Sequence, residues 1–159
     1  VLDPASLAAA MTAVDVVISA LGTPLLLRRV TLLSQGTKYV VAAMRQAGVA
    51  RFLCITGMGA GDSRGHGGFL YDRVILPTLL RSIYADKDRQ EQVVKQSRLD
   101  WTLIRPARLV DTGLTQQYRV ITNFKNEQMS TISRQDVAHF ITQELQQAGY
   151  VQQIVNLTY

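Results

Sequence analysis

Three short apolar segments of this chain each run into small or turn-forming residues. The segment at 52–55 runs into Thr56 and Gly57, and the segments at 14–18 and 101–104 run into the sequences SALG and RPA. In an open α/β sheet, ligands bind in the crevice outside the carboxyl ends of the strands. Parallel strands would bring these three ends together, so the sequence predicts a ligand site at one sheet edge.

Lys87 and Thr56 each have an ordinary structural interpretation. Asp86 and Asp88 flank Lys87, and Glu91 follows four residues later, which in a helix predicts an exposed lysine in an ion pair. Thr56 is either a plain strand residue or, since it ends a strand before glycines, part of the crevice lining.

Other reactive side chains also have structural explanations. Cys54 lies inside a predicted strand, where apolar burial raises the thiol pKa and makes it inert. Ser133 and Asp136 form a capping box before a helical segment. His66 lies in a glycine-rich loop, either solvated or touching a substrate, and no spacing of residues predicts a metal site.

The elements that must position these residues alternate along the chain. The expected helices lie within 1–13, 23–47, 69–98 and 137–147, and the expected strands within 14–21, 52–55, 101–105, 118–122 and 153–157. Thr23 and Pro24 predict the start of the second helix, and Pro77 divides the third. This order predicts an α/β fold with a doubly wound, mostly parallel sheet. Residues 57–68 hold six of the eleven glycines and predict a long, mobile, functional loop.

Length and charge narrow the class of protein. A chain of 159 residues predicts a single domain, and no apolar run approaches the ~20 residues that span a bilayer. The net charge of +5 comes from scattered residues, so we expect no nucleic-acid partner and instead an anionic phosphate cofactor. A single cysteine excludes a disulfide framework and indicates a cytoplasmic protein.

A nucleotide-binding domain of this type should begin with a strand and a glycine-rich turn whose amides bind the pyrophosphate. The sequence starts without that unit, and the glycines at 57–68 do not have the G-x-G-x-x-G spacing. We therefore expect the Rossmann-like domain to be N-terminally incomplete over residues 1–159, lacking roughly two βα units of about 30 residues each.

Several motifs occur in an order that resembles one family. They are LDPASL at 2–7, VDVVISALG at 14–22, Gly36-Thr37 with AGVARF at 47–52, DKDRQE at 86–91, SRLDWTLIRP at 97–106 and ISRQDVA at 132–138. Together they resemble the atypical short-chain dehydrogenase/reductases, in the NmrA-like and biliverdin-IX-beta (flavin) reductase-like branch. The resemblance covers nearly the whole chain and implies a Rossmann fold that binds NADP or NAD, with NADP favoured.

The resemblance also implies site residues. They are Ala20, Leu21 and Gly22 in the turn that passes the adenosine half of the cofactor; Thr56, Gly57 and Met58 beside the nicotinamide; Pro106 and Ala107 against its carboxamide; and Lys87, which reaches its ribose. Lys87 and Thr56 are the implied catalytic residues.

One departure from the family bears on the reaction. The Tyr-x-x-x-Lys pair is absent, because Ile83 stands four residues before Lys87 and Tyr84 only three. Without that general acid, the resemblance favours hydride transfer to a small electron acceptor such as a flavin or quinone. The alternatives are a non-catalytic NAD(P)-binding redox sensor and, less favoured, a remnant that binds nothing.

Overall fold

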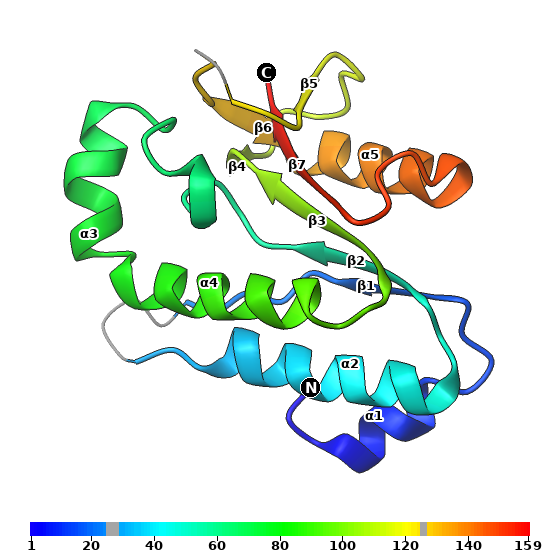
Figure 1. The fold of residues 1–159 in the computed structure, drawn as a ribbon. Helices are drawn as coiled ribbons and strands as arrows, with labels where there is room; N and C mark the ends of the chain where they lie inside the picture. Colours follow the sequence, from blue (N-terminus) through cyan, green and yellow to red (C-terminus); the bar gives the residue numbers. More distant parts are fainter. Residues whose placement is uncertain (25–28, 125–126) are drawn as a thin grey trace.

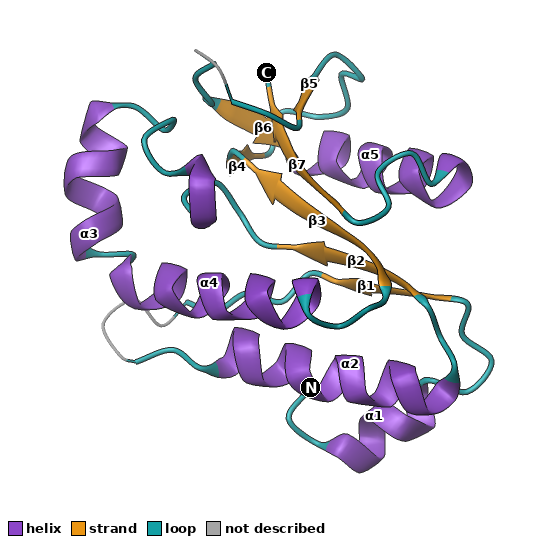
Figure 2. Cartoon of the chain, viewed as in Figure 1, coloured by secondary structure: helices purple, strands orange, loops and turns teal. Residues whose placement is uncertain are grey.

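The computed structural model describes residues 1–24, 29–124 and 127–159, and the fold is a sheet between two helical layers (Figures 1 and 2). In chain order the elements are α1 (Pro4–Ala10), β1 (Val16–Ser19), α2 (Leu32–Ala47), β2 (Arg51–Ile55), the 3₁₀ turn η1 (Gly61–Ser63), the π-helical turn η2 (Tyr71–Ile75), α3 (Leu76–Thr78), α4 (Arg81–Lys95), β3 (Asp100–Pro106), β4 (Arg108–Val110), β5 (Arg119–Ile121), β6 (Thr131–Ser133), α5 (Arg134–Gln147) and β7 (Gln153–Thr158).

The main sheet has the strand order β1-β2-β3-β7-β5. Its first four strands are parallel, and β5 runs antiparallel to β7. The apolar β2 pairs with a parallel strand on each side, as its uninterrupted apolar run predicted. The doubly wound, mostly parallel α/β fold is confirmed. A short parallel pair of β4 and β6, which the sequence pattern did not predict, lies beside the main sheet.

Both faces of the sheet are covered, because successive strand residues point to opposite sides. Phe52 and Cys54 pack into a core with α1, α2 and α4, whereas Leu53 packs with Phe140 of α5 on the other face. Cys54 has no exposed surface, and this burial raises its pKa to about 12. The prediction that Cys54 is a core residue is confirmed.

The start of α2 differs from the prediction. Residues 25–28 lie outside the described part of the chain, residues 29–31 are not helical, and α2 begins at Leu32 rather than at Pro24. Its first turn is capped from α4, because Asp86 Oδ2 accepts hydrogen bonds from the amides of Leu33 (2.9 Å) and Ser34 (3.3 Å). Because this capping residue lies more than fifty residues away along the chain, the sequence around the start of α2 gives no sign of it.

The other predicted helix boundaries agree with the structure more closely. The segment at 69–98 is interrupted, but the break falls at residues 79–80, just beyond Pro77. Ser133 caps α5 through its side chain, as predicted, and Asp3 caps α1 in the same way. None of the helices in the three described ranges has the length and apolar character needed to cross a bilayer.

Candidate functional site

Two cavities meet at the carboxyl edge of the sheet. The first, here called the sheet-edge cavity, measures about 400 Å³ and lies between the ends of β1–β3 and α5. The second, here called the tyrosine cavity, measures about 390 Å³ and lies between the end of β2, the η2–α4 segment and β4. Thr56, Pro106 and Leu109 line both, so the two cavities share a wall.

Every site residue implied by the family resemblance lines one or both of these cavities. The sheet-edge cavity is lined by Ala20, Leu21, Gly22, Thr56, Lys87 and Pro106, together with Ile55, Leu109, Arg134, Val137, Ala138 and Ile141. The tyrosine cavity is lined by Thr56, Gly57, Met58, Pro106 and Ala107, together with Tyr71, Ile75, Leu80, Tyr84, Arg108 and Leu109. The topology therefore brings together residues from four separate stretches of sequence.

Lys87 is half-buried rather than solvent-exposed. Its Nζ donates a hydrogen bond to the carbonyl oxygen of Thr56 and lies 5.8 Å from the centre of the Tyr84 ring. Burial lowers the pKa of Lys87, and the negative charge of Glu91 offsets part of that effect. The alternative of an exposed lysine paired with Glu91 is wrong, because Lys87 bonds to the Thr56 carbonyl and the Glu91 carboxylate is paired with Arg105 and Lys95.

A buried ion pair lies directly behind Thr56. The Arg105 guanidinium donates to both oxygens of Glu91, with Nε–Oε1 at 2.8 Å and Nη2–Oε2 at 2.7 Å. Thr56 Oγ1 donates to Oε1 of the same carboxylate at 2.9 Å. The Thr56 hydroxyl proton is therefore committed to Glu91, while the Thr56 carbonyl is held by Lys87.

The glycines after β2 permit close packing of the loop. Gly59 has φ +103°, and a Cβ there would lie 2.6 Å from Leu76 Cδ1. Gly61 has φ +55°, and a Cβ there would lie 2.5 Å from Arg105 Nη2. The Gly61 amide donates to Asp88 Oδ1 at 3.0 Å, which ties the loop to α4. These glycines let the backbone approach the walls of the site, a role that does not require the phosphate-binding spacing.

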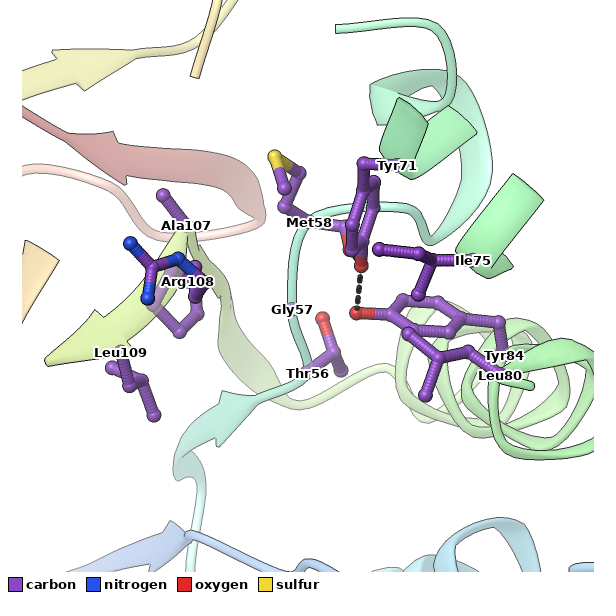
Figure 3. A pocket seen from close by; sticks show the side chains of 11 residues that line it. Thr56, Gly57, Met58, Tyr71, Ile75, Leu80, Tyr84, Ala107, Arg108 and Leu109 are labelled. Carbon is purple, nitrogen blue, oxygen red and sulfur yellow. Dashed lines mark hydrogen bonds between the residues drawn. The ribbon is translucent and has the colours of Figure 1, made fainter. Parts of the chain in front are cut away.

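A pair of tyrosines forms one side of the tyrosine cavity. Tyr71 from η2 and Tyr84 from α4 point toward one another, and their hydroxyl oxygens are 2.9 Å apart (Figure 3). Tyr71 Oη is also 3.0 Å from the carbonyl oxygen of Met58. The sequence pattern did not predict this pair. The available signal was the spacing of Tyr84 and Lys87, because residues three apart lie on the same helix face.

The remaining candidates lie outside both cavities. Asp136 is buried, and its carboxylate accepts hydrogen bonds from Ser133, Thr115 and Tyr159, which places it among structural contacts as the capping interpretation expected. Burial alone would raise the pKa of Asp136, but these bonds hold it well below the ordinary range. His66 stacks on Phe124 with ring centres 4.0 Å apart. Within the described residues, no three or more His, Cys, Asp or Glu side chains group in a way that could hold a metal ion.

The fold is that of an α/β domain whose two cavities, the candidate ligand site, lie at the carboxyl ends of parallel strands, where nucleotides bind in such folds. Residues 1–148 match the NAD(P)H-binding domain family, and the chain belongs to this family.

Solved structures share the fold. ChuY, an anaerobilin reductase from Escherichia coli O157:H7, is 23% identical with a TM-score of 0.80, over 99% of this chain and 71% of that one. A short-chain dehydrogenase/reductase from Veillonella parvula, solved in complex with NADP, is 18% identical with a TM-score of 0.79, over 99% of this chain and 68% of that one. The family match confirms the expected NAD(P)-binding domain, and these structures confirm the Rossmann-like fold.

Proposed function

We propose that this protein is an NAD(P)H-dependent reductase that transfers hydride to a flat, conjugated small molecule such as a flavin or quinone. The observation that carries the proposal is the shared wall between the two cavities. A nicotinamide ring in the sheet-edge cavity and an acceptor in the tyrosine cavity would meet at Thr56 and Pro106. A protein that only senses the cofactor has no need of the second cavity.

The sheet-edge cavity has the chemistry that half of a dinucleotide requires. Ile55, Val137 and Ile141 offer apolar surface for a planar ring, while Lys87 and Arg134 supply positive charge for ribose and phosphate oxygens. When bound, the nicotinamide supplies the hydride. The chain's own residues hold the cofactor and keep water from the shared wall.

Lys87 has a defined role in this proposal. It binds the ribose hydroxyls of the nicotinamide half, exchanging its bond to the Thr56 carbonyl for a bond to the cofactor. Replacing Lys87 by Met should weaken NADPH binding about tenfold, because one hydrogen bond from a charged donor is lost. The measurement is calorimetric titration of NADPH and NADH, with Lys38→Met on the exposed face of α2 as the control.

The proposed function is tested by measuring NADPH oxidation by the wild-type protein. We expect the wild type to bind NADPH and to oxidise it when flavin mononucleotide or 1,4-naphthoquinone is added, followed by the loss of NADPH absorbance. Binding without oxidation by any acceptor would instead support the redox-sensor function. Absence of NADPH and NADH binding would contradict both functions.

A further inference from the structure

The helical segment at residues 69–78, which contains η2 and α3, carries apolar side chains on two opposite sides. On its inner side, Tyr71 lines the tyrosine cavity. On its outer side, Phe69, Leu70 and Val74 are 82%, 65% and 47% exposed. A helix that is apolar all round is normally buried on every side. Among the described residues, none covers the outer side of this segment, so its composition calls for a partner there.

The exposed positions of this segment share one helix face. They recur at 69–70, 73–74 and 77–78, and side chains about four residues apart lie on the same side of a helix. The segment lies at one end of the molecule, with α5 at the other (Figure 1). The exposed residues, here called the outer stripe, continue past the end of α3 and are Phe69, Leu70, Arg73, Val74, Pro77, Thr78, Leu79 and Arg81. Exposed apolar patches that are edged by polar residues mark sites that bind proteins or membranes.

The charges of the outer stripe are all positive. Arg73 and Arg81 are exposed, and neither forms a hydrogen bond or ion pair within the ranges that the structure describes. The carboxylate of Asp72 is turned toward the glycine-rich loop, where it accepts hydrogen bonds from the amides of Gly65 (3.1 Å) and Gly67 (2.9 Å). The outer stripe therefore presents apolar side chains together with cations, and its acidic neighbour is already engaged elsewhere.

This combination favours one class of partner. An apolar helix face edged with arginine is typical of helices that lie in the interface of a bilayer, where the cations meet anionic headgroups. A second copy of the chain is disfavoured, because pairing the stripe with itself across a twofold axis would bring four arginines into one interface. A helix that lies on the membrane surface requires no membrane-spanning segment.

We propose that the outer stripe is a membrane-binding surface that seats the protein on a bilayer containing anionic phospholipids. Phe69, Leu70 and Val74 enter the boundary between headgroups and acyl chains, and Arg73 and Arg81 bind lipid phosphates. This surface assignment does not depend on the proposed reductase function.

The position of the outer stripe also bears on the acceptor. Tyr71, Ile75 and Leu80 of the same stretch form one wall of the tyrosine cavity, so the width of a single helix, about 10–12 Å, separates that cavity from the lipid. Together with the proposed reductase function, on which this step rests, the surface indicates a quinone that is dissolved in the membrane. NAD(P)H would give its hydride to the quinone and become NAD(P)⁺, and the quinone would take one proton from water to form the hydroquinone.

The surface is tested by co-sedimentation of the wild type with phosphatidylcholine vesicles that contain or lack phosphatidylglycerol. We expect binding that requires phosphatidylglycerol and weakens as salt is raised. Leu70→Ser should weaken the binding about tenfold, because an apolar side chain is lost from the acyl boundary. Arg73→Gln with Arg81→Gln should weaken it about 30-fold, because two cations are lost from an anionic surface.

Two variants elsewhere in the molecule provide matched controls. Leu145→Ser removes an exposed leucine from α5, and Arg98→Gln removes an exposed arginine beyond the end of α4 that is opposite Arg81. Both should bind the vesicles as the wild type does. None of the substituted residues lines either cavity, so NADPH affinity should be unchanged in every variant.

Insertion into the bilayer is measured separately from adsorption. The emission of Phe69→Trp should shift to shorter wavelength on anionic vesicles and be quenched by brominated acyl chains, whereas the wild type, whose Trp101 is buried, should show neither change. Failure of the wild type to bind anionic vesicles, or equal binding by Leu70→Ser, would overturn the surface assignment. A concentration-dependent dimer that Leu70→Ser abolishes, without vesicle binding, would overturn it in favour of a second copy of the chain.

The acceptor is tested with a long-chain menaquinone placed in the anionic vesicles. We expect Leu70→Ser to lower the rate of menaquinone reduction about tenfold and to leave the reduction of dissolved 1,4-naphthoquinone unchanged. Reduction of naphthoquinone without reduction of menaquinone would overturn the membrane-dissolved acceptor alone. Vesicle binding without reduction of either quinone would overturn the acceptor and contradict the reductase function, while the membrane-binding surface would stand.

Discussion

Arg105 connects several parts of the candidate site through its side-chain ion pairs. It has no exposed surface, and it links β3 to Glu91 of α4 and, at 2.5 Å, to Asp62 in the loop after β2. Glu91 in turn holds the Thr56 hydroxyl. One buried guanidinium thus fixes the sheet end, the helix and the loop relative to one another.

Breaking this buried pair should be costly. We expect Arg105→Leu to lower the free energy of unfolding by about 3–5 kcal/mol, since it leaves the buried Glu91 carboxylate with only the 3.7 Å ion pair to Lys95. Removing both charges, in Arg105→Leu with Glu91→Leu, should recover part of that loss. The exposed pair of Arg134 and Asp111 provides the control, and its disruption by Asp111→Ala should cost no more than about 1 kcal/mol in urea denaturation.

Cys54 should make stability depend on alkaline pH. Its folded pKa of about 12 lies above the ordinary thiol value of about 8.5, so the native state keeps a proton that the unfolded state releases. The contribution of Cys54 is therefore complete below about pH 8.5 and declines as pH rises toward 12, by up to about 1.4 kcal/mol per pH unit. Urea denaturation between about pH 7.5 and 9.5 should show this slope in the wild type and lose it in Cys54→Ala. Equal slopes would contradict the assignment.

At the scale of single residues, strand ends were predictable and side-chain partners were not. Apolar runs that stop in small residues placed Thr56, Gly57 and Pro106 at the cavities, because parallel strands end at one edge. The sequence pattern paired Glu91 with Lys87 through helix spacing, whereas the structure pairs Glu91 with Arg105 from a neighbouring strand. Tyr71 was missed for a similar reason, since its partner Tyr84 lies across a helix break.

At the scale of elements, α2 and α4 behave as one unit because Asp86 of α4 caps α2. Replacing Asp86 by Ala should lower the free energy of unfolding by about 2 kcal/mol, since two amides and the Ser34 hydroxyl lose a buried charged acceptor. Native-state hydrogen exchange should show the loss at the Leu33 and Ser34 amides. Asp3→Ala, which removes the exposed cap of the short α1, should cost about 1 kcal/mol or less.

The same contact explains the wrong helix boundary. Thr23 and Pro24 carry the local signals of a helix start. The first turn of α2 instead lies eight residues after Pro24, where the carboxylate of Asp86 from α4 accepts a hydrogen bond from the Leu33 amide. The cap of α5, which Ser133 supplies from the helix's own sequence, was predicted correctly. Local patterns therefore give the boundaries that local hydrogen bonds determine.

At the scale of the whole molecule, the order of elements was sufficient to predict the fold. Strands separated by helices allow few topologies, since parallel strands need crossover connections and short loops limit where those can run. The short β4–β6 pair was not predicted because β4 follows β3 after a single residue and β6 runs directly into α5, so the sequence does not separate either strand from its neighbour. The cavities also required the fold, since their walls come from segments that are distant in sequence.

The division of the walls between the two cavities has a consequence for how such a protein diversifies. Most residues that line only the tyrosine cavity come from a single stretch, 57–84, whereas the sheet-edge cavity draws on β1, β2, α4 and α5. Substitutions confined to that stretch can reshape one cavity while the other keeps its lining. A lineage could thus exchange one small-molecule preference for another through substitutions within residues 57–84 alone. A protein engineer could transplant the same contiguous segment between homologues.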